Sequence, residues 1–159
     1  MESPERSRCW ETNSPEETLA VARELTSLWT PQGVVGLVGP LGSGKTTFVR
    51  GVVEACGGVQ QPVRSPTFTL LNQYATSPEV FHADLYRTSS VRDQETIGLE
   101  QRFDSGILLV EWADRWQGSW PSEAEWLEFS YADKKSRIIR HYRDYDCFQQ
   151  RLKSLETDM

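Results

Sequence analysis

The chain has few cysteines, no long apolar run and no excess of positive charge. Its three cysteines, Cys9, Cys56 and Cys147, are an odd number without a Cys-x-x-Cys pair, so neither a disulfide framework nor a zinc site is indicated. No apolar run approaches the ~18 residues of a membrane-spanning helix, and the first ten residues lack the apolar centre of a signal peptide. We therefore expect a cytoplasmic protein with reduced thiols and no membrane partner.

The balance of charge is acidic. The sequence has 17 Lys and Arg residues against 23 Asp and Glu residues, a net charge of −6. Such a balance repels polyphosphate unless basic side chains are locally concentrated, so we do not expect the chain to hold RNA or DNA by itself. Its 159 residues have the usual length of one domain, with one active site as the default.

A glycine-rich loop is the most specific motif. Residues 39–46 read Gly-Pro-Leu-Gly-Ser-Gly-Lys-Thr, a pattern in which glycines allow backbone N–H groups to turn toward a phosphate. In this motif the lysine, here Lys45, reaches the β- and γ-phosphates, and the hydroxyl of Thr46 ligates Mg²⁺. Thr47 is a candidate donor to the α-phosphate. The loop therefore predicts a site for a nucleoside triphosphate with magnesium.

The segments around the loop predict its structural context. Residues 34–38 are continuously apolar and valine-rich, as in a strand buried on both faces, and a helical pattern runs from Lys45 to about Cys56. Ser14 as N-cap and Glu17 as its capping-box partner predict the start of an earlier helix. Further strands are expected at 68–74, 80–85, 106–110, 126–131 and 137–142, and helices at 91–103 and 148–155.

These elements predict an α/β fold of the phosphate-loop NTPase type. A central, mostly parallel sheet is flanked by helices and extended by antiparallel hairpins. Residues 1–13 are polar and expected to be a flexible, frayed N-terminus. The ATPase domain is expected over 14–142, and residues 143–159 as a helical C-terminal extension.

Two acidic residues are candidates for the chemistry. Glu111 directly follows the buried run at 106–110, and open parallel sheets bind ligands at the C-terminal ends of their strands. Its carboxylate could hold a magnesium-bound water or orient the attacking water, or be a solvated acid. Asp84 could do the same, or form a surface pair with Arg87. His82 reads as a packed or hydrogen-bonded histidine rather than a catalyst, since its neighbours in sequence include no nucleophile.

A Ser-Pro-Thr segment at 65–67 is a third candidate. It lies between the loop helix and the next predicted strand, where nucleotide-sensing switch segments occur. Thr67 could contact the γ-phosphate or its magnesium. A proline turn that leads into a strand is the alternative.

Taken in order, these motifs resemble those of the TsaE family, small phosphate-loop ATPases required for threonylcarbamoyladenosine formation in tRNA. The resemblance runs from about Ser14 to Arg140 and departs at Pro40, where the family usually has aspartate. The segments that carry it are Leu-Gly-Ser-Gly-Lys-Thr-Thr-Phe at 41–48, Ser-Pro-Thr-Phe-Thr-Leu at 65–70, His-Ala-Asp-Leu-Tyr-Arg at 82–87 and Val-Glu-Trp at 110–112.

The resemblance implies an ATPase subunit that works with TsaB and TsaD proteins, so that tRNA is met only through the complex. It implies ATP or ADP and Mg²⁺ as ligands, with Thr46 and Glu111 at the metal. The residues that it implies as catalytic are Lys45, Glu111, Asp84 and Thr67. The residues that it implies as nucleotide-binding are Leu41, Gly42, Ser43, Gly44, Lys45, Thr46, Thr47 and Arg137.

Other functions stay open on the residues alone. A phosphate-loop small-molecule kinase needs an acceptor pocket and a basic lid, and the arginines at 87, 92, 102 and 115 form no compact lid in the sequence. A nucleotide-gated binding module with little turnover is a further alternative. A GTPase is disfavoured, because neither Asn13 nor Asn72 precedes a lysine as in the guanine-reading Asn-Lys-x-Asp motif.

Overall fold

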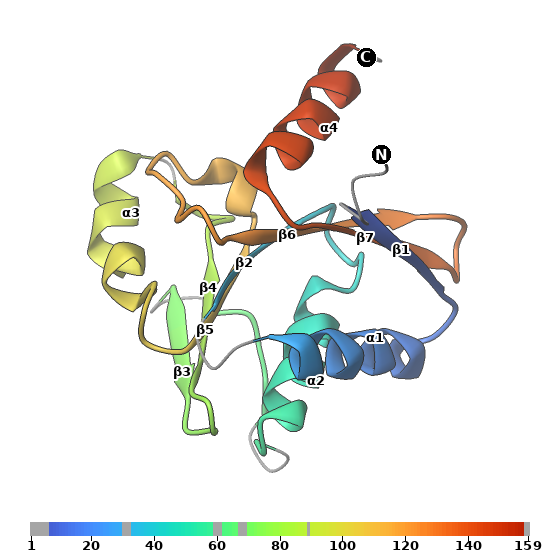
Figure 1. Ribbon diagram of the computed structural model, residues 1–159, viewed down its shortest axis with the longest axis horizontal. Coiled ribbons are helices and arrows are strands. Elements are labelled where there is room, and N and C mark those ends of the chain that lie inside the picture. The colour runs from blue at the N-terminus through green and yellow to red at the C-terminus, as the bar shows by residue number, and fades with distance from the viewer. Residues whose placement is uncertain (1–6, 30–32, 59–61, 67–69, 89, 158–159) are drawn as a thin grey trace, which may run out of the picture.

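The glycine-rich loop joins the central strand of a seven-stranded sheet to a helix. The structure is a computed structural model, which describes residues 7–29, 33–58, 62–66, 70–88 and 90–157. The strand order is β1-β7-β6-β2-β5-β4-β3. Strands β6, β2, β5 and β4 run parallel to one another, and β1, β7 and β3 are antiparallel additions (Figure 1). The strands are β1 (Ser7–Thr12), β2 (Gly33–Val38), β3 (Leu71–Tyr74), β4 (Val80–Asp84), β5 (Ile107–Glu111), β6 (Glu125–Tyr131) and β7 (Arg137–Tyr142). The predicted fold class is confirmed.

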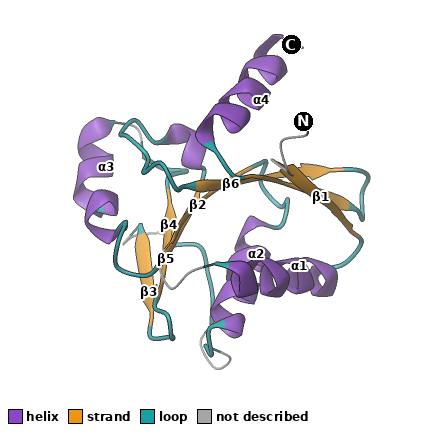
Figure 2. Cartoon of the chain, in the orientation of Figure 1, coloured by secondary structure: helices purple, strands orange, loops and turns teal. Residues whose placement is uncertain are grey.

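Helices cover both faces of the sheet, as Figure 2 shows. Successive side chains of a strand point to opposite faces, so Val35 and Leu37 of β2 pack against one helix layer, whereas Val34 and Val38 pack in the other core. The first layer is formed by α1 (Pro15–Leu28) and α2 (Lys45–Ala55). A strand buried on both faces needs apolar side chains at consecutive positions, which explains the unbroken apolar run before the loop.

Helix α1 begins at the predicted N-cap, Ser14, but the carboxylate of Glu17 binds a different backbone N–H group than in a standard capping box. The Ser14 hydroxyl accepts a hydrogen bond from the Glu17 backbone N–H at 3.2 Å. The Glu17 carboxylate accepts from the backbone N–H of Asn13, at 2.7 Å, one residue before the cap. Both bonds satisfy N–H groups at or just before the helix start and fix the point where the chain leaves β1.

The prediction of a frayed segment up to residue 13 is wrong for residues 7–12, which form β1. This strand pairs antiparallel with β7, from Ser7 opposite Tyr142 to Thr12 opposite Arg137. Trp10 packs against the core beneath the sheet. An edge strand is held by backbone hydrogen bonds to a partner far along the chain, so its polar composition does not predict it.

The bounds of α3 and β3 differ from the prediction as well. The helix expected over 91–103 is α3 (Val91–Ile97) followed by a 3₁₀ turn, η1 (Leu99–Arg102). Gly98 separates them with φ of 71°, a left-handed conformation that ends an α-helix. Strand β3 begins at Leu71, and residues 68 and 69 of its predicted range lie outside the described residues.

Helix α4 (Tyr145–Thr157) is longer than the predicted 148–155 and lies on the opposite face of the sheet from α1 and α2 (Figure 1). Its anchor is Phe148, which is buried and stacks on Trp126 of β6 with ring centroids 4.4 Å apart. The Trp120 ring packs edge-on against Trp126 at 4.7 Å. Arg151 of α4 also forms an ion pair with Glu128 of β6, at 3.1 Å.

Phe148→Ala is expected to lower the free energy of unfolding by about 3–5 kcal/mol, because it leaves a cavity against Trp126. Urea denaturation of the wild type and the variant measures this difference. Ser154→Ala on the exposed side of α4 is the control and should change stability by less than about 0.5 kcal/mol. A loss below about 1 kcal/mol for Phe148→Ala would contradict the packing of α4 on the sheet.

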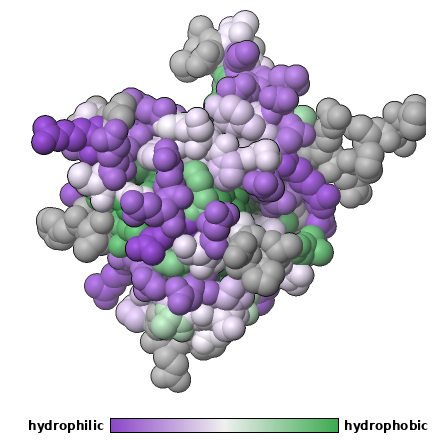
Figure 3. Space-filling model, turned by 60° about the vertical axis from the view of Figure 1, so that its left-hand side comes forward, coloured by the Kyte–Doolittle hydropathy of each residue, from purple (hydrophilic) through white to green (hydrophobic). Residues whose placement is uncertain are grey.

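The outer surface is mainly polar on the face drawn in Figure 3, where apolar side chains gather mostly near the centre. Over the described ranges, none of the helices combines the length and the apolar character needed to cross a membrane.

Candidate nucleotide site

The glycine-rich loop is shaped as an anion cradle. Gly42 and Gly44 have φ of 76° and 105°, in the left-handed region that residues with side chains rarely adopt. Gly44 is the N-cap of α2 and offers no side chain to accept from the first N–H groups of that helix. These N–H groups, together with the positive end of the helix dipole, are therefore available to a phosphate.

Lys45 is held toward the loop rather than extended into solvent. The residue is only 4% exposed, and its ammonium donates to the carbonyls of Gly39 at 2.5 Å and Pro40 at 2.9 Å. Burial lowers the pKa of Lys45, an effect that the carboxylates of Glu111 and Asp84 partly oppose. Pro40 lacks an N–H group, but its carbonyl takes part in orienting the lysine.

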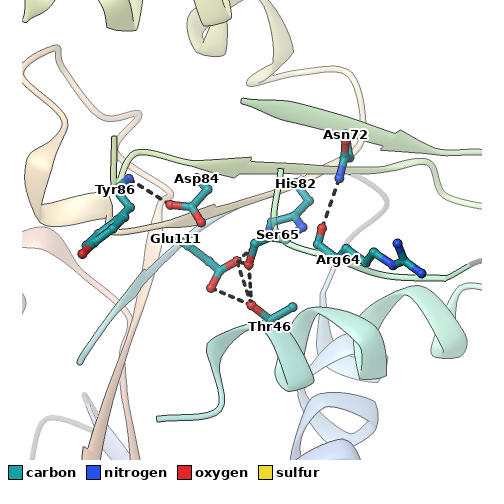
Figure 4. Close-up of polar contacts among 8 residues, drawn as sticks. All are labelled: Thr46, Arg64, Ser65, Asn72, His82, Asp84, Tyr86 and Glu111. Carbon is teal, nitrogen blue, oxygen red and sulfur yellow. Dashed lines mark hydrogen bonds and ion pairs between the residues drawn. The ribbon is translucent and has the colours of Figure 1, made fainter. Parts of the chain in front are cut away.

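Glu111 is the point at which distant segments of the sequence meet (Figure 4). It ends β5 and is 3% exposed. Its two carboxylate oxygens lie 3.0 and 3.2 Å from the hydroxyl oxygen of Thr46, at the start of α2. The Ser65 hydroxyl lies 2.9 Å from that of Thr46, and Nε2 of His82 lies 2.5 Å from Oε2 of Glu111.

This arrangement explains which groups could hold a metal ion. The described part of the chain has no cluster of three His, Cys, Asp or Glu side chains arranged as a metal site. Mg²⁺ does not require one, because it binds through one or two protein oxygens and completes its shell with phosphate and water. The Thr46 hydroxyl and the Glu111 carboxylate fit that requirement.

Asp84 ends β4 and lies opposite Glu111 in the parallel register of β4 and β5. One of its oxygens accepts from the Tyr86 backbone N–H at 2.8 Å. Asp84 and Arg87 both line the same cleft. Among the described residues, they do not form an ion pair with each other. Burial raises the pKa of Asp84, the Tyr86 N–H opposes this rise, and Glu111 adds to it.

The raised pKa of Asp84 predicts a dependence of stability on pH. A carboxyl whose pKa is higher in the folded state favours folding while it is protonated, and this contribution is lost as pH rises through the folded pKa. Asp84→Asn should therefore be more stable than the wild type at pH 7, and its advantage should shrink toward about pH 4, near the ordinary pKa of aspartate. Thermal unfolding at both pH values tests this. Asp104→Asn, at an exposed position, is the control, and an equal advantage for Asp84→Asn at both pH values would contradict the prediction.

A cleft of about 370 Å³ contains most of the predicted site. Lys45 and Thr46, Asp84, and Glu111 all line it, so residues predicted from three separate parts of the sequence share one cleft. Its lining consists of Leu41, Gly42, Gly44, Lys45, Thr46, Thr47, Ser65, Pro66, Leu70, Asp84, Tyr86, Arg87, Glu111 and Trp112.

Arg137 lies on the other side of the loop, where it helps to tie the β6–β7 hairpin to the glycines. Its guanidinium donates to the Gly42 carbonyl at 3.4 Å and lies 4.2 Å from the ring centroid of Tyr131. The Tyr131 hydroxyl donates to the Leu41 carbonyl. A second cleft, of about 310 Å³, is lined by Arg137 and Thr47 together with the start of α1. The loop is therefore flanked by two clefts that share Gly42, Gly44 and Thr47.

Not all of the predicted site residues are found lining the clefts. Ser43 is buried and lines neither cleft, whereas Leu41 is exposed at the cleft rim. Thr67 lies outside the described residues. The partners of two further residues at the site, His82 and Tyr131, were missed from sequence, because each partner belongs to another strand or loop.

Trp112 has a backbone conformation that side-chain-bearing residues seldom adopt. Its φ of 57° lies in the left-handed region, and such strain is found mainly where surrounding structure or function requires it. Its ring lies 4.5 Å from the ammonium of Lys45 and 5.0 Å from the guanidinium of Arg115. Trp112 thus forms a wall of the cleft that faces the lysine of the loop.

A glycine loop between a parallel strand and a helix, with a lysine, a threonine and a strand-end carboxylate brought together beside it, defines the phosphate-loop class of α/β proteins. Residues 12–140 match the family model described as "Threonylcarbamoyl adenosine biosynthesis protein TsaE". The chain belongs to this family, which confirms the resemblance predicted from its motifs.

Individual relatives agree with this assignment. The chain is 41% identical over 133 residues to the tRNA threonylcarbamoyladenosine biosynthesis protein TsaE of Aquifex aeolicus, covering 82% of this chain and 92% of the relative. It is 39% identical over 132 residues to the Bacillus subtilis protein of the same name, covering 82% of each. The crystal structure of Bacillus subtilis YdiB superposes with a TM-score of 0.73 at 29% identity, covering 96% of this chain and 95% of that one.

Proposed function

We propose that this chain binds ATP with Mg²⁺ and hydrolyses it as a subunit of the machinery that forms threonylcarbamoyladenosine in tRNA. The observation that carries the proposal is the approach of Glu111 to Thr46, at 3.0 Å, beside the buried ammonium of Lys45. These are the groups that a phosphate-loop ATPase uses to hold a metal and the γ-phosphate. The names of the Aquifex and Bacillus relatives support the pathway.

The two clefts suggest how the nucleotide lies. The loop N–H groups and Lys45 would bind the β- and γ-phosphates, with the γ-phosphate in the cleft that Glu111 and Asp84 line. The nucleoside would extend past Thr47 toward Arg137 in the second cleft. The positive charge of Lys45, enclosed by carbonyls and the Trp112 ring, would be most effective in this partly dehydrated place.

Each side chain of the site would have a different role in the hydrolysis. Magnesium, when bound, would neutralise charge on the β- and γ-phosphate oxygens. Thr46 would hold the ion while its hydroxyl hydrogen is donated to Glu111. Asp84, whose pKa is raised by burial, would orient the attacking water and accept its proton. The water oxygen bonds to the γ-phosphorus as the bond to the β–γ bridging oxygen breaks, which yields ADP and phosphate.

Arg87 lines the same cleft and is a second positive charge there, besides Lys45. Its guanidinium would stabilise charge on the transferred phosphoryl group. The hydrolysis that results would be slow in the isolated chain and faster in the complex, because TsaB-like and TsaD-like partners would complete the site. The net charge of −6 agrees with tRNA being held by those partners.

The test is the release of phosphate from ATP, measured with the chain alone and with its two partner subunits. We expect slow release alone and a clear increase with both partners present. Phosphate that appears on an added metabolite would instead identify a small-molecule kinase. No turnover, with equal ATP-dependent complex formation by the wild type and Glu111→Gln, would identify a nucleotide-gated binding module.

A further inference from the structure

His82 is a fully buried histidine that takes no direct part in the proposed hydrolysis. It lies in the middle of β4, opposite Leu109 of β5 and two residues before Asp84, and its side chain is 0% exposed. Its Nε2 atom lies 2.5 Å from Oε2 of Glu111. A leucine or phenylalanine would fill the same place in the core without introducing polar atoms, so the imidazole needs an explanation.

The two nitrogens of the ring show which way the imidazole acts. Within the described part of the chain, Nδ1 is buried without a hydrogen-bond partner. A buried N–H group without an acceptor is costly, whereas a buried nitrogen lone pair that accepts no hydrogen bond costs less. Nδ1 is therefore assigned as the bare nitrogen, and Nε2 carries the hydrogen that it donates to the carboxylate of Glu111.

The contacts of Glu111 divide between its two oxygens. Oε1 makes the shorter contact with Thr46, at 3.0 Å, whereas Oε2 receives His82 at 2.5 Å and lies 3.5 Å from the Ser65 hydroxyl (Figure 4). A glutamate side chain turns about three bonds, so a single contact at Thr46 would not fix the plane of its carboxylate. The imidazole holds one oxygen against the core, and the other is left facing the hydroxyl that starts α2.

We propose that His82 is a positioning residue of the nucleotide site, which acts by holding the Glu111 carboxylate in the orientation that serves the magnesium ion. The inference rests on the proposed function, since it concerns the same metal position. Side chains that orient metal-site ligands typically contribute about 10- to 100-fold to metal affinity or activity. A histidine that only fills the core would contribute to stability and leave the metal requirement unchanged.

The test compares the Mg²⁺ dependence of the wild type and His82→Leu. The binding of a fluorescent ATP analogue is titrated with Mg²⁺ and repeated in EDTA, and ATP turnover is titrated with Mg²⁺ in parallel. We expect His82→Leu to need about 10- to 100-fold more Mg²⁺ for half-maximal effect in both assays. Binding in EDTA should stay within about twofold of the wild type, because the loop and Lys45 are untouched.

A matched pair of amides keeps the test independent of the fold of His82→Leu. His82→Gln carries an N–H donor at about the reach of Nε2 and should restore most of the wild-type Mg²⁺ dependence. His82→Asn carries its donor nearer the backbone, at about the position of Nδ1, and should behave like His82→Leu. Equal Mg²⁺ dependence in the two amide variants would overturn the proposal.

A double variant separates positioning from packing. In a Glu111→Gln background the charged carboxylate is gone, so adding His82→Leu should leave the Mg²⁺ dependence unchanged. The same increase in that background as in the wild type would overturn the proposal. His82→Leu with reduced thermal stability and wild-type Mg²⁺ dependence would do so as well. A wild type that binds the analogue equally with and without Mg²⁺ would instead overturn the proposed function, and the role of His82 with it.

Discussion

Lys45→Ala is expected to lower partner-stimulated ATP turnover by about 100- to 1,000-fold, the usual cost of removing a preorganised group that stabilises transition-state charge. In the folded chain the ammonium is already oriented by the carbonyls of Gly39 and Pro40 and is largely withdrawn from water. Little reorganisation is then needed when phosphate arrives. Such an interaction is stronger in a partly dehydrated site than the same charge would be on the surface.

The measurement is the rate of phosphate release, with ATP affinity determined separately. Lys153→Ala on α4 is the matched control, since it removes the same charge from an exposed position away from the loop. Thermal stability of Lys45→Ala should be preserved, because burial already disfavours the charged form of this lysine, as its lowered pKa indicates. Full partner-stimulated turnover in Lys45→Ala would remove Lys45 from the assigned roles.

The phosphate loop could be predicted from sequence because its chemistry is local. The lysine and the threonine of the motif are placed by the spacing within one short loop, and the strand and helix on either side are visible as an apolar run and a helical period. Glu111 and Asp84 could be placed at the ends of strands in the same way. Their approach to the loop depends on the order of β2, β5 and β4 in the sheet, which no local pattern specifies.

The contacts that were missed are all non-local. Residues 7–12 become a strand only because β7, more than 120 positions later, offers them an edge. The sequence neighbours of His82 do not indicate its partner, because Glu111 is 29 positions away on the adjacent strand. Tyr131 reaches the Leu41 carbonyl across 90 positions. In each case pairing of strands, which follows from the packing of the whole chain, decides the role of the residue.

Glu111→Gln is the second variant for which we expect a loss of about 100- to 1,000-fold in turnover. The substitution keeps the size and shape of the side chain, so the core around β5 is not disturbed. It replaces an acceptor oxygen by an NH₂ donor, and the carboxylate now lies between the Thr46 hydroxyl and Nε2 of His82. The amide NH₂ can face the Thr46 hydroxyl only if that hydroxyl accepts instead of donating, and it cannot accept from Nε2 of His82. In either orientation the negative charge beside the magnesium position is lost.

The measurement that distinguishes this variant from Lys45→Ala is ATP binding. Glu111→Gln should bind ATP in EDTA within a few-fold of the wild type, because the loop amides and Lys45 are intact, whereas Lys45→Ala should lose affinity under the same conditions. Glu95→Gln, at an exposed position of α3, is the control for the change of charge. If Glu111→Gln bound ATP and the partner subunits but did not turn over, Glu111 would act in the hydrolysis step rather than in assembly. Wild-type turnover in Glu111→Gln would contradict a role for this carboxylate at the metal, and the 3.0 Å contact with Thr46 would then be structural.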